Sequence, residues 1–170
     1  VPLRRAAARP GLTQVLDNRR EILGVQPGLI AIDHDDYHAE HIGRTRDGRQ
    51  FILTNPFDPA NGSNPGCEFV ALYTFDKNGQ LVEAKIDSFG PRSGLDDGAR
   101  SSLYSERLAS LGEVSFERVE VAPFAVERFD IEFGLIARPP EEDDDSWAVE
   151  MQPGNYMAFF EPWDSGEYDT

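Results

Sequence analysis

A β-hairpin is predicted by the segments Glu68-Phe-Val-Ala-Leu-Tyr-Thr-Phe-Asp76 and Gln80-Leu-Val-Glu-Ala-Lys-Ile-Asp87, which Lys77-Asn78-Gly79 joins. In the second segment, Val82, Ala84 and Ile86 alternate with charged residues, which is typical of a strand with one face in water. The first segment is apolar on both faces. We therefore expect it at the centre of a sheet.

More hairpin patterns lie on both sides of this one. Residues 41–46 and 49–54 flank Asp47-Gly48, a strong turn signal, and residues 147–151 and 155–160 flank Pro153-Gly154. Single strands are also predicted over residues 29–32, 117–122 and 129–137. Residues 55–66, which are rich in Asn, Asp, Pro and Gly, predict an irregular loop.

Two helices are indicated. An approximate apolar stripe predicts the first over residues 12–23. For the second, Asp97 is the expected N-cap, Tyr104, Leu108 and Leu111 share one face, and Gly112 ends the helix. Because hairpins dominate and no βαβ rhythm is present, we expect an α+β fold: a mostly antiparallel sheet with one or two packed helices.

The length of 170 residues suits one domain. We expect a flexible basic extension over residues 1–11, followed by a single acidic domain over residues 12–170. No apolar run approaches the roughly 18 residues that a membrane-spanning helix needs. With one cysteine and no export signal, we expect a soluble, cytoplasmic protein.

The negative charge is concentrated in the second half of the chain. The formal net charge is −15, and residues 101–170 carry 17 acidic against 4 basic side chains. Such a field repels phosphate backbones, so we do not expect nucleic acid as a partner. It favours encounter with a basic protein, although simple solubility would also explain it.

Seven residues are candidates for contact with such a partner. Glu141, Glu142, Asp143, Asp144 and Asp145 form an acidic run, and Trp163 and Tyr168 are aromatic residues of the kind that dominate binding interfaces. The two aromatic residues could instead pack back on the domain. The acidic run lacks the ligand spacing of a calcium loop, which favours a solvated loop.

All three histidines, His34, His38 and His41, lie within eight residues and alternate with carboxylates. On a helix they would share one face, where three imidazoles could hold zinc and leave a position for water. A nearby carboxylate could then act as a general base. In a turn, the same histidines would point apart. Neither HExxH nor paired CxxC is present.

Cys67 is the only cysteine and follows Asn64-Pro65-Gly66. A thiolate nucleophile paired with a histidine is conceivable there, but a lone cysteine is more often a small buried apolar residue. The chain contains no GxxxxGK[ST], GxGxxG or GxSxG motif, which weakens nucleotide-binding and serine-hydrolase hypotheses.

Three functional hypotheses remain. The leading one is a binding domain, of an inhibitor, immunity or adaptor kind, that uses its acidic half against a basic protein. The alternative is a metal-dependent hydrolase that uses the three histidines and a divalent metal such as zinc. The third is a structural subunit of a larger assembly. The sequence does not decide whether the protein is an enzyme, or its oligomeric state.

Overall fold

The computed structural model describes residues 26–142 and 146–170. The predicted extension over residues 1–11, the predicted helix over residues 12–23, and Asp143, Asp144 and Asp145 all lie outside the described residues. Within the described part, the chain is mostly antiparallel β-sheet with one helix, so the predicted α+β class is confirmed. No helix in this part is long and apolar enough to cross a bilayer.

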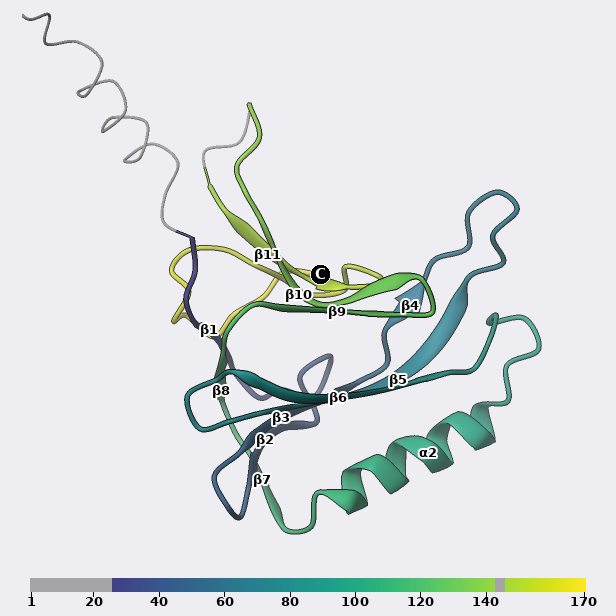
Figure 1. Cartoon of the computed structure of the whole chain (residues 1–170), viewed down its shortest axis with the longest axis horizontal. Helices are drawn as coiled ribbons and strands as arrows, with labels where there is room; N and C mark the ends of the chain where they lie inside the picture. The colour runs from purple at the N-terminus through teal and green to yellow at the C-terminus, as the bar shows by residue number, and fades with distance from the viewer. Residues whose placement is uncertain (1–25, 143–145) are drawn as a thin grey trace, which may run out of the picture.

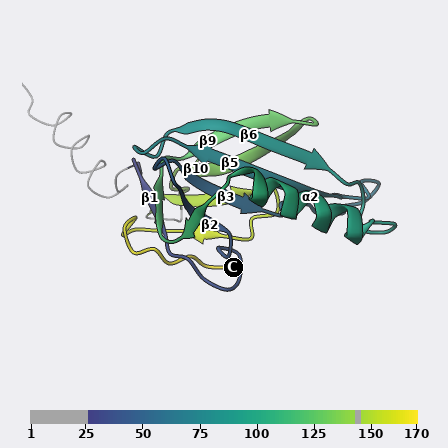
Figure 2. The same ribbon diagram turned by 90° about the horizontal axis from the view of Figure 1, so that it is seen from below.

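The described chain forms three layers (Figures 1 and 2). Helix α2 (Asp97–Ser110) covers one face of a six-stranded sheet of order β4-β5-β3-β2-β7, with β6 on the other edge of β5. A four-stranded sheet of order β12-β11-β10-β9 covers the opposite face, and β1 pairs with β8 beside both. The strands are β1 (Ile30–Ile32), β2 (Ile42–Thr45), β3 (Gln50–Thr54), β4 (Phe57–Asp58), β5 (Cys67–Phe75), β6 (Leu81–Ser88), β7 (Val114–Phe116), β8 (Val119–Val121), β9 (Phe124–Arg128), β10 (Ile131–Arg138), β11 (Ala148–Gln152) and β12 (Ala158–Phe159).

The predicted central hairpin is confirmed as β5 and β6, and β5 has neighbours on both edges. Val82 on β6 does not share the buried face that the alternation predicted for it. The register shifts at Thr74/Phe75, so Phe75 pairs with Leu81 and Thr74 with Glu83. The intervening Val82 is therefore 60% exposed, because a bulge interrupts the two-residue alternation.

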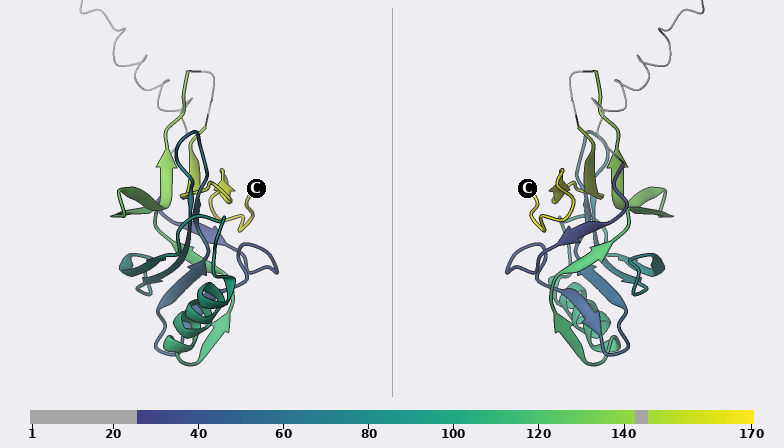
Figure 3. Two further views of the ribbon diagram at one scale, coloured as in Figure 1. Left: turned by 90° about the vertical axis from the view of Figure 1, so that its right-hand side faces the viewer. Right: turned by 90° about the vertical axis from the view of Figure 1, so that its left-hand side faces the viewer.

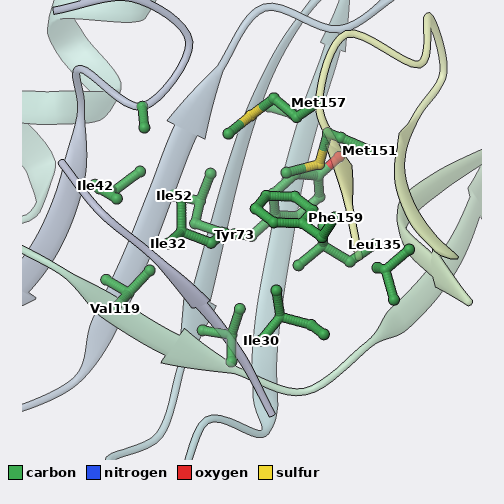
Figure 4. Packing of buried hydrophobic residues seen from close by; sticks show 14 of the residues in the cluster. Ile30, Ile32, Ile42, Ile52, Tyr73, Val119, Leu135, Met151, Met157 and Phe159 are labelled. Carbon is green, nitrogen blue, oxygen red and sulfur yellow. The ribbon is translucent and has the colours of Figure 1, made fainter. Parts of the chain in front are cut away.

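Strand β5 separates two hydrophobic clusters because successive side chains point to opposite faces. Phe69, Tyr73 and Phe75 enter the main core between the two larger sheets. Figure 4 shows Tyr73 among side chains from β1, β10, β11 and β12. Val70 and Leu72 face α2 in the smaller cluster. The apolar character of both faces, noted in the sequence, thus reflects burial between a sheet and a helix.

The helix begins one residue earlier than its predicted cap implied. Asp96, not Asp97, is the N-cap: its carboxylate accepts a hydrogen bond from the Ala99 backbone N–H at 2.9 Å. Both aspartates suit a cap chemically, and only the backbone conformation chooses between them. Tyr104, Leu108 and Leu111 pack on the smaller cluster as predicted.

Several strand boundaries were wrong. Strands β7 and β9 were not predicted, and β4 lies inside the predicted irregular loop. Strand β10 starts at Ile131 rather than at Phe129, because Phe129 and Asp130 form the turn between β9 and β10 with φ of 56° and 58°. Such a turn usually carries Asn or Gly, so its sequence shows no turn signal. Strand β12 is shorter than predicted.

Candidate functional site

The histidine-rich segment forms a loop with tight turns, not a helix. Asp35 organises it: its carboxylate accepts hydrogen bonds from the backbone N–H groups of Tyr37 at 2.8 Å and Ala39 at 3.0 Å. Asp and Asn side chains commonly stabilise turns in this way. The single helical face on which a three-histidine zinc site depended is therefore absent from this loop.

Two of the histidines contact one exposed aromatic ring. The ring of His34 stacks on Phe116 at 5.8 Å, and the ring of His41 meets the same phenyl edge-on at 5.5 Å. His34 Nε2 lies 2.9 Å from the Glu40 carbonyl oxygen, so this nitrogen donates. Because the Tyr104 hydroxyl donates to a backbone carbonyl, it accepts its 2.6 Å bond from His41 Nδ1.

The third histidine has different neighbours. His38 lies against the rings of Tyr37 at 3.8 Å and Tyr156 at 5.2 Å. Burial lowers the pKa of His38 below its usual value, and the nearby Asp35 carboxylate opposes this only in part. Among the described residues, no group of three or more His, Cys, Asp or Glu side chains is arranged to hold a metal ion. The zinc and hydrolase hypotheses stay predictions that the described geometry does not support.

Cys67 is half-buried at the start of β5. Its Sγ lies 3.1 Å from the Ser88 hydroxyl and 3.7 Å from the Glu68 carbonyl oxygen. No histidine in the described part of the chain hydrogen-bonds to this thiol, so the arrangement that would activate a cysteine nucleophile is not formed there.

The loop is tied to the C-terminal segment of the chain. The Tyr168 hydroxyl donates to the Asp35 carboxylate and accepts a hydrogen bond from the His38 backbone N–H at 3.2 Å. The Asp33 backbone N–H donates to the Gly166 carbonyl oxygen at 2.9 Å. Gly166 has a φ of +84°, a backbone conformation that favours glycine, and a Cβ there would stand 2.3 Å from the Asp33 carboxyl group, which would have to rotate away.

These contacts shift two pKa values in opposite directions. Burial is the main cause that raises the pKa of Tyr168 to about 12, and the hydrogen bond to Asp35 is the second. Burial also opposes ionisation of Asp35, but the hydrogen bonds from Tyr168, Tyr37 and Ala39 outweigh it and lower the pKa of this carboxyl below its usual value. Asp35 is therefore a charged carboxylate at neutral pH.

A groove with a cavity volume of about 630 Å³ lies where the loop meets the C-terminal segment. Five carboxylates line it, and we call it the acidic groove. They belong to Asp33, Asp35, Asp36, Glu167 and Asp169. Within residues 26–142 and 146–170, only Asp33 of these five pairs with an arginine, Arg118 at 3.1 Å.

Many other carboxylates of the acidic half have arginine partners. Glu117 pairs with Arg44 at 3.1 Å, and Glu150 pairs with Arg138 at 3.2 Å. Glu113, Glu120 and Glu132 form longer pairs of 3.9–4.0 Å. The negative charge of residues 101–170 is thus partly neutralised within the fold. The acidic groove, to which residues 33–36 also contribute, contains four carboxylates without an arginine partner among the described residues.

Of the seven residues proposed for partner binding, the four that the structure describes do not form one surface. Glu141 and Glu142 are exposed beyond the end of β10, at the hairpin that projects away from the C-terminal segment (Figure 3). Trp163 and Tyr168 are half-buried and pack against the main core. Tyr168 nevertheless lines the acidic groove, whereas Trp163 borders a separate shallow concavity.

No protein-family model, curated protein or solved structure matches this chain. Sequence reasoning missed the groove because its two sides are more than 120 residues apart. Two signals were available in the sequence: Tyr168, which is predicted to contact a partner, and the density of aspartates around the histidines, which is interpreted above as support for a metal.

Proposed function

We propose that this protein is a binding domain that recognises a basic protein through the acidic groove. The observation that carries the proposal is the convergence of five carboxylates on one concavity, four of them without an arginine partner in the described chain. Inhibitor, immunity and adaptor proteins are the kinds of binding domain that fit such a surface.

The groove suits lysine or arginine side chains for two physical reasons. Carboxylates that line a concavity produce a focused negative potential, which speeds the approach of a cationic partner and weakens with salt. In addition, Tyr37 lines the groove with 66% of its surface exposed. An exposed tyrosine ring beside carboxylates offers a cation–π contact to an arriving guanidinium or ammonium group.

The same charge argues against a nucleic-acid partner, because phosphates would be repelled. We also propose a cytoplasmic location, since Cys67 is the only cysteine and the chain cannot form an internal disulfide.

A pull-down from a lysate of the source cell at low salt tests the proposal with two charge-matched variants. The first neutralises the groove with Asp36→Asn, Glu167→Gln and Asp169→Asn. The control neutralises three exposed carboxylates elsewhere with Glu106→Gln, Glu127→Gln and Asp130→Asn. Both variants lose three negative charges, so they differ in where the charge is lost.

We expect the wild type and the control variant to retain a basic protein at low salt, and the groove variant to retain none. About 0.3 M salt should release the retained protein, because the charges are then screened. Equal retention by both variants would show that only the overall charge matters. Failure of the wild type to retain any basic protein would also remove the proposal.

A further inference from the structure

A second concavity borders the same loop and is lined by residues from β4, β5 and the first turn of α2. Its volume is about 300 Å³, at the lower end of the range for small-molecule sites. We call it the arginine cleft, and the residues that define it are Tyr37, Phe57, Glu68, Arg92, Arg100 and Tyr156. It lies outside the proposed function, which concerns the acidic groove.

A buried carboxylate organises the cleft. The Glu68 side chain is only 7% exposed. Arg92 Nε donates to Glu68 Oε1 at 2.8 Å, and Arg100 Nη1 forms an ion pair with Glu68 Oε2 at 3.6 Å. A carboxylate at this depth requires such partners, because an unpaired buried charge is strongly unfavourable. Glu68 in turn holds the Arg92 guanidinium at the wall of the cleft.

The Arg92 side chain is 78% exposed, and the fold uses only part of its hydrogen-bonding capacity. It contacts Glu68 through Nε alone, and no described residue accepts a hydrogen bond from its two terminal nitrogens. Arg100, by contrast, also donates through Nη2 to Asp97 at 3.2 Å. The free edge of the Arg92 guanidinium is a planar pair of N–H donors, which matches the two oxygens of a carboxylate.

The remaining walls are largely aromatic. Phe57 and Tyr156 lie with their ring centroids 6.2 Å apart, and Tyr37 contributes an exposed ring. The Tyr156 hydroxyl is already bonded to the Thr54 hydroxyl at 2.8 Å, so this residue offers mainly its ring to a ligand. Flat aromatic walls favour a flat, apolar ligand body through stacking or edge contacts.

The charge of the cleft limits what can bind. Arg92 and Arg100 are balanced by Glu68 and by the exposed Glu40, which also lines the cleft. A phosphate dianion would therefore meet no net positive charge and would be repelled by a chain of net charge −15. A single carboxylate carries half the charge of that dianion and fits the geometry of the guanidinium.

We infer that the arginine cleft binds a small aromatic monocarboxylate, with its carboxylate on the terminal nitrogens of Arg92 and its ring against the aromatic walls. Glu68 acts as the positioning residue for Arg92.

NMR titration of the whole chain with benzoate tests this, with benzamide and inorganic phosphate as comparison probes. The variants are Arg92→Gln, Arg92→Lys and the control Arg46→Gln, whose side chain is 87% exposed and makes only a 3.9 Å surface pair. Melting curves first establish that each variant is folded. Arg92→Lys keeps the positive charge beside Glu68 and removes the planar pair of donors.

We expect saturable millimolar binding of benzoate that shifts the Arg92 Nε–H and Tyr156 ring signals. Both Arg92 variants should bind about tenfold more weakly or worse, as expected for loss of a charge-assisted hydrogen-bond pair, and the control should be unchanged. Absence of saturable binding to the wild type would overturn the inference. So would equal binding of benzamide or phosphate, or unchanged benzoate affinity in both Arg92 variants.

Discussion

Tyr168→Phe removes the hydroxyl that links the loop to the C-terminal segment and leaves the ring in the core. The variant loses the hydrogen bond to Asp35 and leaves the His38 backbone N–H without its acceptor. A hydrogen bond to a charged group contributes about 1.5–3 kcal/mol, and water can partly replace it at a half-buried position, so we expect a loss of about 1–2 kcal/mol.

For a chain of this size, each 1 kcal/mol lowers the melting temperature by about 2–4 °C. Thermal unfolding followed by circular dichroism at neutral pH therefore checks the magnitude. Tyr37→Phe is the matched control, because Tyr37 is an exposed tyrosine in the same loop. Its hydroxyl forms no hydrogen bond within the described chain. The control should melt within about 1 °C of the wild type.

The pH dependence of this variant carries a second, independent expectation. The pKa of Asp35 is lowered in the folded state, so its contribution is present above the unfolded value of about 3.9 and is lost as the pH falls through the lower folded value. The difference between wild type and Tyr168→Phe should therefore shrink on acidification below about pH 4. A stability difference near zero at neutral pH, or one that is unchanged at pH 3, would refute the reasoning.

Three further predictions follow from the core and the loop. Tyr73→Phe should be neutral or slightly stabilising, because the Tyr73 hydroxyl is buried without a partner in the described structure. Tyr156→Phe, which loses a hydrogen bond to Thr54, should lower the free energy of unfolding by about 1 kcal/mol in chemical denaturation. The opposite ranking of the two variants would show that these hydroxyl groups have other hydrogen-bond partners than described. Gly134→Ala should destabilise by about 3 kcal/mol or more or prevent folding, since its Cβ would stand 2.1 Å from the Phe124 carbonyl oxygen at a φ of +141°, and a wild-type melting curve would disprove this. Protein purified without an affinity tag should contain no stoichiometric zinc by elemental analysis, because the three imidazoles have other partners; one zinc per chain would restore the hydrolase hypothesis.

The strands whose patterns are local were predicted well. The β5–β6 hairpin follows from alternation around an Asn-Gly turn, and β2–β3 follows from Asp47-Gly48. The turn at Phe129 and Asp130 escaped prediction because its left-handed backbone is imposed by pairing of β9 with β10, and stacking of Phe129 on Phe69 at 5.9 Å helps to offset the unfavourable conformation. Local sequence does not contain that information.

The candidate sites also depend on contacts that the local sequence does not specify. The histidine spacing predicted a shared face only for a helix, and the hydrogen bonds to the Asp35 carboxylate select a turned loop instead. The burial of Glu68 between two arginines was equally invisible, because Arg92 and Arg100 reach it from residues more than 20 positions away.

The amino-acid sequence by itself determined the antiparallel α+β class, the apolar strand at the sheet centre and the net charge, because alternation, turn chemistry and ionisation are properties of neighbouring residues. Only the tertiary structure decided which carboxylates are neutralised by arginine and which converge on a groove. Ion pairing depends on distances between residues far apart in the chain, and those distances exist only once the sheets have packed.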